Sequence, residues 1–406
     1  MSYIFNNQIK YADSQNLDAF GRLRTSNITS LLEYKHTFDK LPLVINEVTA
    51  GTATSTYQAV NSQVSMTTSA NNDYVIRQGK SRGIYQPGKS QIFEGSFSRF
   101  DLQTNVIKRI GYFTTSTSAP YDSVEDGFFL ESDGQTGVIS FQIWQSGTTI
   151  LSAATSSWLT TDYDVTNINW SKTQLMVVDF QWLGVGRVRF GLVIDGLTKT
   201  FVINSGTNNL NNVYMKAPNQ PVRYEIRQVG AGSGVFNMIC SQISLEGSIN
   251  ALQRSLGLVQ FDTVQATTSG TKYPLIGYRL NQGYEGVNIT LSDIQTINTS
   301  NPSKSDFYIT AELNPTLSSS ATFTGVTNTG VAYSISTGQT VTTSGYILST
   351  FLGSGSGIQV DNFQFEDNML RPGVNINGTY DEVWICVVTN GSNQTLRSAI
   401  NLSYFL

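Results

Sequence analysis

The stretch Gln174–Ile203 reads QLMVVDFQWLGVGRVRFGLVIDGLTKTFVI, and its pattern decides the fold class. Apolar side chains recur at every second position in two runs, the first at Met176, Val178, Phe180 and Trp182 and the second at Val188, Phe190, Leu192 and Ile194. Successive side chains of a β-strand point to opposite faces, whereas an α-helix repeats about every 3.6 residues. The period of two therefore predicts half-buried antiparallel strands.

Two short segments predict how these strands are joined. Asp195-Gly196 suits a type I′ turn, in which both central residues have positive φ, so Leu197–Ile203 is predicted to return as the partner strand. Gly184-Val185-Gly186 is predicted to form a bulge or bend between the first two strands. It is not a dinucleotide-binding fingerprint, because no helical pattern follows it.

The same pattern extends outward in both directions along the chain. Short apolar runs recur at intervals typical of sheet proteins, separated by turn residues such as Tyr85–Lys89 (YQPGK), Asp133-Gly134 and Gly230–Gly234. Asp133-Gly134 is a second hairpin signal. We therefore predict an all-β protein whose N-terminal body is an antiparallel β-sandwich of jelly-roll type.

Length and a change in composition predict more than one domain. The chain has 406 residues, which is long for a single domain. The sequence becomes richer in Ser, Thr and Gly after residues 248–257 (SINALQRSLG), a segment predicted as a short helical connector. The expected order is an extended N-terminal arm at 1–30, a β-sandwich at 31–247, a linker at 248–257 and a second, smaller and distal β-sandwich domain at 258–406.

Composition narrows the functional class. Charged residues make up 13% of the chain, about half the usual share, and aromatic residues 11%, so a large core and a neutral polar surface are expected. The net charge is −4 and no basic run occurs, which argues against nucleic-acid binding. No apolar run approaches the length of a membrane span, and no signal peptide is visible at the N-terminus, so synthesis in the cytoplasm without membrane insertion is expected.

Residues for catalysis or metal binding are scarce. The single histidine, His36, lies in a strand-like run and is predicted to be a strand residue rather than a general base. Cys240 and Cys386 lie in apolar runs and are predicted to be buried free thiols; a disulfide between them is the alternative. We expect no catalytic residues, no cofactor and no metal site, and hence a protein that is not an enzyme.

Carboxylates leave one catalytic alternative open, because glycoside hydrolysis needs only a pair of them. Turn capping is the other interpretation of the candidates, which are Asp126, Glu131, Asp162, Asp164, Glu366 and Asp367. The segments 361–367 and 162–164 are weak calcium candidates, because they lack the glycine and terminal glutamate of an EF-hand loop.

Two groups of side chains are candidates for binding other molecules. In Leu17–Arg24 (LDAFGRLR), Phe20 and Leu23 could dock on a neighbouring sheet of the same chain, or the segment could anchor the protein, with Arg22 and Arg24 pairing with carboxylates of another subunit. In the distal half, Tyr333, Tyr346 and Phe351 are candidates for stacking on sugars, with core packing as the alternative.

Several segments together resemble a known group of proteins. They are Asp18–Asn27 (DAFGRLRTSN), Arg77–Gln91 (RQGKSRGIYQPGKSQ), Arg109–Phe113 (RIGYF), Asp126–Phe129 (DGFF), Gln181–Gly196 (QWLGVGRVRFGLVIDG), Tyr214–Ile226 and Met238–Gly247 (MICSQISLEG). The chain resembles virion structural proteins of tailed, often marine, bacteriophages that are fibre- or capsid-associated. Beyond residue 250 the resemblance continues mainly at Tyr273–Leu280 (YPLIGYRL).

The resemblance implies a particle component and carries no catalytic residues. We therefore expect a surface-exposed virion protein, a fibre, spike or decoration, anchored to the capsid or tail through its N-terminal part. The implied partners are further copies in a homotrimer and other capsid, collar or tail proteins. The alternative is a host-attachment module that binds a receptor or glycan, and a further one is a tailspike polysaccharide depolymerase.

Overall fold

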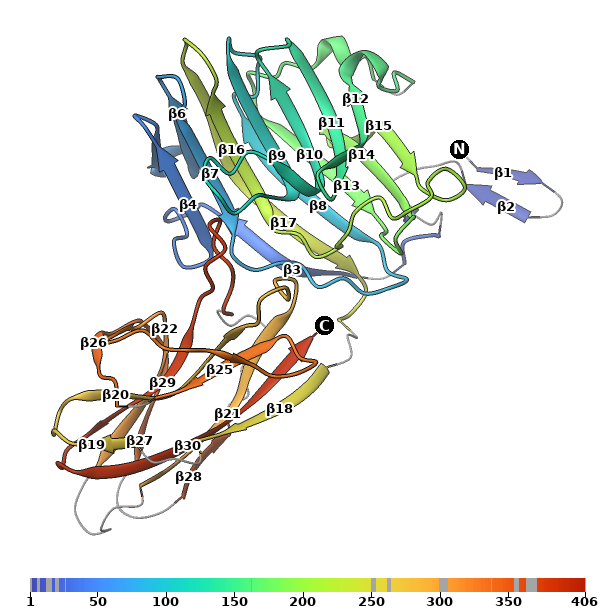
Figure 1. The fold of residues 1–406 in the computed structure, drawn as a ribbon. Coiled ribbons are helices and arrows are strands. Elements are labelled where there is room, and N and C mark those ends of the chain that lie inside the picture. The colour runs from blue at the N-terminus through green and yellow to red at the C-terminus, as the bar shows by residue number, and fades with distance from the viewer. Residues whose placement is uncertain are drawn as a thin grey trace. The chain divides into compact units, whose positions relative to one another are not determined.

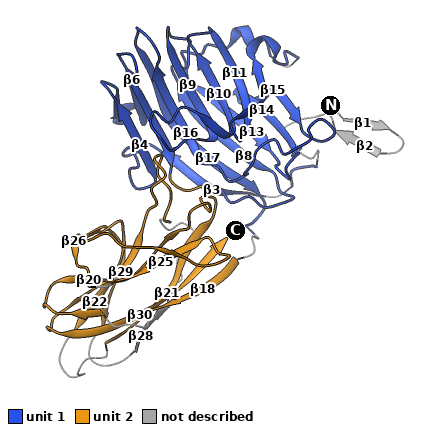
Figure 2. Ribbon diagram, in the orientation of Figure 1, with its two compact units in different colours: residues 1–79, 83–250 blue, residues 80–82, 251–406 orange. Residues whose placement is uncertain are grey.

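The computed structural model describes residues 2–5, 8–11, 17–18, 22–25, 27–161, 163–249, 253–260, 264–298, 306–336, 338–353, 358–362 and 371–405. The chain divides into two compact units, unit 1 with residues 1–79 and 83–250, and unit 2 with residues 80–82 and 251–406 (Figure 2). Within the described ranges the regular structure is β-strand, apart from three single-turn 3-10 helices. No helix there is long and apolar enough to cross a membrane.

Unit 1 is an antiparallel β-sandwich (Figure 1). Its seven-stranded sheet has the order β12-β11-β10-β9-β16-β7-β4 and comprises β4 Ile45–Ala50, β7 Tyr74–Gly79, β9 Val106–Thr115, β10 Val124–Asp133, β11 Val138–Gln145, β12 Thr148–Ala154 and β16 Val222–Gln228. Its eight-stranded sheet has the order β15-β14-β13-β8-β17-β6-β5, with β3 also on β17, and comprises β3 Ile28–Lys35, β5 Thr54–Gln58, β6 Gln63–Thr68, β8 Gln91–Ser98, β13 Gln174–Phe180, β14 Arg187–Ile194, β15 Leu197–Ser205 and β17 Gly234–Glu246.

The stretch that predicted the fold forms three neighbouring strands, β13, β14 and β15. Asp195 and Gly196 have φ values of 54° and 76°, which confirms the predicted type I′ turn. The bend before β14 is closed by the Gly186 N–H, which donates to the Trp182 carbonyl over 2.8 Å. The alternation is also confirmed, since the apolar set is buried at Met176, Val178, Phe180, Val188, Phe190 and Leu192.

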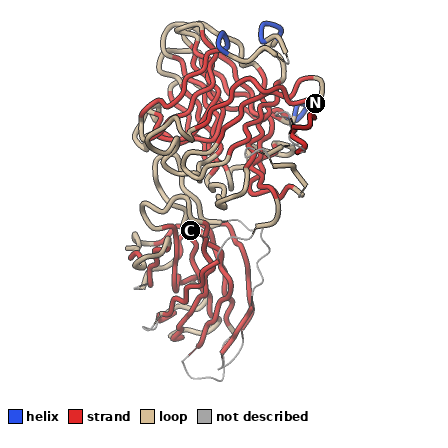
Figure 3. Tube along the Cα trace, turned by 90° about the vertical axis from the view of Figure 1, so that its right-hand side faces the viewer, coloured by secondary structure: helices blue, strands red, loops and turns tan. Residues whose placement is uncertain are grey.

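An aromatic layer fills the space between the two sheets of unit 1. Phe141 of β11 stacks on Phe190 of β14 with ring centroids 4.6 Å apart, and Phe128 of β10 meets Phe180 of β13 at 5.0 Å. All four rings are fully buried. Because each pair joins one sheet to the other, these contacts hold the sheets face to face. Figure 3 shows that the described chain consists of strands and connecting loops, with little helix.

Two predicted turns differ in detail from the expectation. The hairpin at Asp133 exists, but its loop has four residues, and the Gly137 N–H donates to the Asp133 carbonyl over 2.9 Å. Gly230–Gly234 does not join a hairpin. The strand before it, β16, belongs to the seven-stranded sheet and the strand after it, β17, to the eight-stranded sheet, so this turn crosses between the layers.

Unit 2 is a second antiparallel β-sandwich with its own apolar core. One sheet contains β18 Gln253–Val259, β19 Val264–Ala266, β21 Asn288–Asn298, β28 Ile358–Asn362 and β30 Gln394–Phe405. The other contains β20 Lys272–Leu280, β22 Phe307–Leu313, β24 Thr324–Gly325, β25 Val331–Ile335, β27 Tyr346–Gly353 and β29 Val383–Thr389. A small two-stranded sheet pairs β23 Thr316–Leu317 with β26 Val341–Thr343.

The predicted helical connector at 248–257 is wrong for its second half. Gln253–Val259 is strand β18 and pairs along its whole length with the closing strand β30, where Leu256 faces Leu402. Pairing with a long partner strand overrides the local helical propensity. Residues 250–252 lie outside the described residues.

The predicted extended arm at 1–30 also differs. Ser2–Phe5 (β1) pairs with Gln8–Tyr11 (β2) as a two-stranded hairpin, and Ile28–Ser30 already belong to β3. Leu17 forms an isolated bridge with Leu23. The N-terminal segment therefore has local structure that its polar composition did not indicate.

The aromatic layer predicts a large effect of truncating one ring. Phe190→Ala should lower the free energy of unfolding by about 3–5 kcal/mol, because it removes buried area and leaves a cavity between the sheets. Urea denaturation followed by tryptophan fluorescence reports mainly unit 1, which holds four of the five tryptophans (Trp144, Trp158, Trp170 and Trp182), whereas Trp384 lies in unit 2. Val60→Ala is the control, because Val60 is 98% exposed and should change stability by less than about 0.5 kcal/mol. Equal stability of both variants would contradict the assigned role of the layer.

Candidate functional site

A buried cluster of ion pairs, here called the arginine–glutamate cluster, lies on the outer face of the seven-stranded sheet. Its members are Arg109, Glu131, Arg223, Glu225 and Arg227. Glu225 is fully buried and accepts hydrogen bonds from Arg109 (2.9 Å) and Arg223 (2.8 Å), while Arg109 also donates to Glu131 over 2.6 Å. The pairs of Arg109 with Glu131 and with Glu225 form because these residues are direct cross-strand partners on β9, β10 and β16. Arg223 and Glu225 lie two residues apart on β16 and therefore share one face of the strand.

A loop between β9 and β10 covers this cluster. The carbonyls of Pro120 and Tyr121 both accept hydrogen bonds from Arg227, at 2.8 and 2.6 Å, and Tyr121 also accepts one from Arg223. Arg223 lies over the ring of Phe113 at 5.5 Å. The guanidinium groups thus tie the loop to the sheet, and this face of unit 1 is closed by its own chain.

The arginines control the ionisation of Glu225. Burial by itself raises the pKa of its carboxyl group, but the positive charges of Arg227, Arg223 and Arg109 outweigh it and hold the pKa far below the ordinary value. The carboxylate is therefore charged in the folded state. Its depressed pKa contributes stability above the pKa of the unfolded chain, and this contribution is lost as the pH falls toward the folded-state value.

Replacing this carboxylate should be costly. Glu225→Gln should lower the free energy of unfolding by about 3–5 kcal/mol near pH 7, because three buried guanidinium groups lose their common counter-charge. The difference in the free energy of unfolding between the variant and the original chain should shrink below about pH 4, because the glutamate of the unfolded chain takes up a proton there. Urea denaturation at pH 7 and pH 3 measures both. Glu33→Gln, at an exposed position, is the control. If the loss of stability in Glu225→Gln were the same at both pH values, an electrostatic origin of that loss would be contradicted.

A second group of charges, here called the N-terminal clasp, holds the N-terminal segment on the eight-stranded sheet. Arg24 pairs with Asp179 of β13 and, over 3.0 Å, with Glu246 of β17. Arg189 of β14 also pairs with Asp179 and donates over 2.6 Å to the carbonyl of Leu17, which is buried. The segment therefore crosses the outer face of the sheet from β17 to β14.

The predicted anchoring residues have different surroundings. Arg24 is engaged within its own chain, and Arg22 pairs with Asp18 and donates to the Gly88 carbonyl over 2.9 Å. Leu23 is 49% exposed. Phe20 lies outside the described residues. Docking on another protein through these residues stays a prediction, in which only Leu23 and the exposed part of Arg22 would take part without first breaking the clasp.

Segments far apart in the sequence meet in these two clusters, and they are the segments that carry the resemblance described above. Asp18–Asn27, Gln181–Gly196 and Met238–Gly247 contribute to the N-terminal clasp through Arg24, Arg189 and Glu246. Arg109–Phe113 and Tyr214–Ile226 contribute to the arginine–glutamate cluster. Asp126, from a further segment, accepts hydrogen bonds from the backbone of Lys216 (2.7 Å) and Ala217 (2.9 Å). Residues of these segments thus brace the sandwich.

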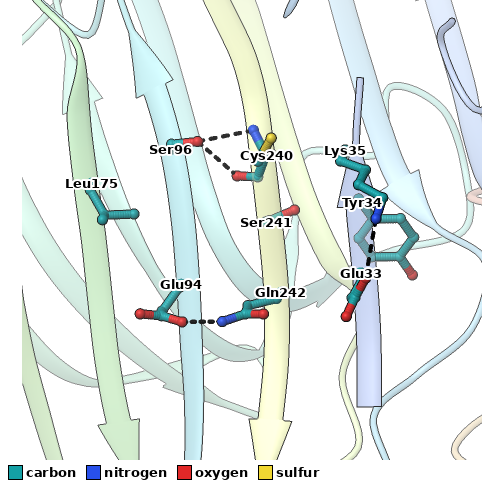
Figure 4. A pocket seen from close by; sticks show the side chains of 9 residues that line it. All are labelled: Glu33, Tyr34, Lys35, Glu94, Ser96, Leu175, Cys240, Ser241 and Gln242. Carbon is teal, nitrogen blue, oxygen red and sulfur yellow. Dashed lines mark hydrogen bonds and ion pairs between the residues drawn. The ribbon is translucent and has the colours of Figure 1, made fainter. Parts of the chain in front are cut away.

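A polar groove of about 390 Å³ lies on the outer face of the eight-stranded sheet, beyond the clasp (Figure 4). Strand register explains its lining, because direct cross-strand partners point to the same face. One row across four neighbouring strands is Leu175, Ser96, Cys240 and Lys35. The next row is Val177, Glu94, Gln242 and Glu33.

Hydrogen bonds orient the polar groups of the groove. Gln242 donates its side-chain N–H to the carboxylate of Glu94, and the Lys35 Nζ lies 3.7 Å from the Glu33 Oε2. The Ser96 hydroxyl accepts from the Cys240 N–H over 3.0 Å and donates to the Cys240 carbonyl over 3.2 Å. This double contact lies beside the register shift between Met238 and Cys240. The groove therefore offers a carboxylate, an amide and a thiol on a rigid floor.

Cys240 corrects one prediction, because its thiol is exposed on the outer face of β17, whereas Cys386 is buried as predicted and both are free. The apolar run around Cys240 is real, but alternation along β17 turns the cysteine away from the core. His36 follows β3 and is buried, with Nδ1 2.7 Å from the Ile239 carbonyl. Burial lowers the pKa of His36 to about 4, so it is neutral, and it faces Arg77 through Nε2.

The carboxylates considered for glycoside hydrolysis are dispersed. Asp126 accepts hydrogen bonds from a neighbouring loop, Glu131 belongs to the arginine–glutamate cluster, and Asp164 accepts from the Thr166 N–H over 2.9 Å. Asp162, Glu366 and Asp367 lie outside the described residues. Within the described ranges no group of three or more His, Cys, Asp or Glu side chains is placed to hold a metal ion.

The distal aromatic candidates are not brought together. Tyr333 lies on β25 and Tyr346 and Phe351 on β27, with β20, β29 and β22 between these strands. Tyr333 and Phe351 pack against the core of unit 2, and only Tyr346 is exposed, at 51%. These three side chains therefore do not form a common stacking surface.

Comparison with known proteins gives structural similarity only. No family model and no curated protein matches the sequence. Among similar solved structures, a conserved carbohydrate esterase from Shiga toxin-encoding bacteriophage phi24B is 13% identical, with a TM-score of 0.34, over 55% of this chain and all (100%) of that chain. A legume lectin-like domain from Entamoeba histolytica is 8% identical, with a TM-score of 0.31, over 54% and 98%.

Arcelin-5, a lectin-like defense protein from Phaseolus vulgaris, is 7% identical, with a TM-score of 0.34, over 54% of this chain and 99% of that chain. These identities and scores are too low to carry over a ligand or an activity. The fold class is that of the structure itself, an all-β chain with antiparallel sandwiches.

Proposed function

We propose that this chain is a surface-exposed structural protein of a virus particle. The proposal rests on the resemblance of several segments to virion structural proteins. In the structure, residues of those segments pair with one another across unit 1, Arg24 with Glu246, and Arg109 and Arg223 with Glu225. This pairing braces the sandwich and supports a role as a rigid component of a particle.

Further features of the chain agree with this role. Two sandwiches with separate cores give a protein that is stable through apolar burial, and both cysteines are free, so its stability does not depend on disulfide bonds. The N-terminal clasp holds Leu17 and Arg24 on the body, and we assign attachment to a neighbouring protein to the residues before Leu17.

The direct test is the composition of the particle. Quantitative mass spectrometry of density-gradient-purified particles should find this chain at a fixed ratio to the major capsid protein. Deletion of residues 1–16, which leaves Arg24, Asp179 and Glu246 in place, should remove the chain from particles without changing its thermal unfolding. Absence of the intact chain from purified particles would contradict the proposal, and normal incorporation of the deleted chain would contradict N-terminal anchoring.

A second function, binding of a glycan on the host surface, is supported by the polar groove rather than by the distal aromatic residues. Oriented carboxylate and amide groups on a rigid floor suit the hydroxyl groups of sugars. Glu94 and Gln242 hold each other in position, and Leu175 adds an apolar surface beside them.

Glycan binding by the groove has its own test. A glycan array with the intact chain should give signals that Gln242→Ala reduces at least about tenfold, because the amide that points into the groove is lost. The matched control is Gln145→Ala, an amide on β11 of the other sheet, which should leave the signals unchanged. Absence of any glycan signal, or an equal loss in both variants, would remove this function and leave the particle role untouched.

A further inference from the structure

We propose that the N-terminal hairpin of one copy of this chain adds to the open edge of β3 in a second copy, so that copies join head to tail. The inference concerns self-association of the chain and is independent of its place on a particle. It arises from two elements of unit 1: an edge strand whose outer side pairs with no described strand, and a hairpin that the described residues do not join to a sheet.

The acceptor is a vacant strand position beside β3. On one side β17 pairs with β8, and on the other it pairs with β6 through Gly234–Met238 and with β3 through Cys240–Glu246. The next position outward is filled beside β6 by β5. Within the described ranges no strand pairs with the outer edge of β3.

The edge of β3 is suited to receive a strand. It is eight residues long, with no Pro in its sequence ITSLLEYK, and its charged residues Glu33 and Lys35 lie toward one end only. Ile28 is 59% exposed, and Leu31 and Leu32 are half-buried. A long edge with apolar side chains and few protecting charges is a template for pairing with another chain unless something covers it.

The donor is the hairpin of β1 and β2, whose strands Ser2–Phe5 and Gln8–Tyr11 pair with each other. Within the described part of the chain neither strand pairs with a third one. A two-stranded hairpin alone in water is only marginally stable and needs a third strand or a packing surface. Docking on a free edge supplies both the missing hydrogen bonds and the surface.

The N-terminal clasp indicates that the acceptor belongs to another copy. It holds Leu17 on Arg189 of β14, and the position beyond β3 is five strand spacings away, about 24 Å at about 4.8 Å each. From Leu17 back to Tyr11 there are six Cα steps, which span at most about 22 Å when fully extended. The two lengths are about equal, so pairing with β3 of the same chain needs a fully extended connection across the sheet, whereas a copy placed beside β14 and β15 needs none. The geometry therefore favours an acceptor in another copy.

This geometry makes the contact heterologous, because the donor and the acceptor are different surfaces. The donor is tethered at β14 and the acceptor is β3, toward the other end of the same sheet. Such contacts close into a ring when the rotation between copies permits it. The homotrimer expected from the resemblance would be one such ring. The number of copies follows from the rotation and not from the pairing itself.

The first experiment compares masses in solution. Sedimentation velocity of the intact chain should give a concentration-dependent multiple of 44.5 kDa, and deletion of residues 1–11 should give the single-chain mass with an unchanged thermal unfolding midpoint. A single-chain mass for the intact protein at all concentrations would overturn the proposal. So would an oligomer that survives the deletion.

The second experiment identifies the edge. The donor variant carries S2C. The acceptor variant lacks residues 1–11 and carries I28C, and both variants carry C240S, which removes the exposed thiol. When the two variants are mixed and treated with a bis-maleimide, they should give a cross-linked heterodimer, a product that cannot arise within one chain. The matched acceptor T149C places the thiol on β12, an edge of the other sheet, and should give at least tenfold less product. Equal cross-linking of the two acceptors would overturn the assignment to β3.

Discussion

Burial of one aromatic layer between two antiparallel sheets is the constraint on which the rest of unit 1 depends. Phe128, Phe141, Phe180 and Phe190 occupy this layer and are fully buried. Because the inner faces are used for packing, polar chemistry is confined to the outer faces, the sheet edges and the connecting loops. The same constraint aligns the strands and thereby places side chains from distant segments in common rows.

The two outer faces of unit 1 then differ in how they are used. The seven-stranded sheet is closed by its own β9–β10 loop, which the arginine–glutamate cluster holds in place. The eight-stranded sheet carries the N-terminal clasp at one end, and beyond it lie the polar groove and the outer edge of β3, with which no described strand pairs. The surfaces proposed for glycan and for a second copy therefore belong to a single sheet, whereas the other serves as a support.

Several sequence predictions failed for one common reason. Gln253–Val259 has a helical propensity, but β30 offers it a partner strand, and Cys240 has apolar neighbours, but its position in β17 turns it outward. In each case the outcome depends on which strand lies beside which, and this information is not local in the sequence.

The sequence by itself determined the strand character of the chain, the Asp195-Gly196 turn and the set of side chains that face the core, because alternation and turn chemistry act between residues close together in the chain. Only the tertiary structure decided the pairing of Arg24 with Asp179 and Glu246, the meeting of Glu94 with Gln242, and the pairing of β3 with β17. These features need strands more than a hundred residues apart to become neighbours in a defined register. That register is set by packing the two sheets together over the aromatic layer.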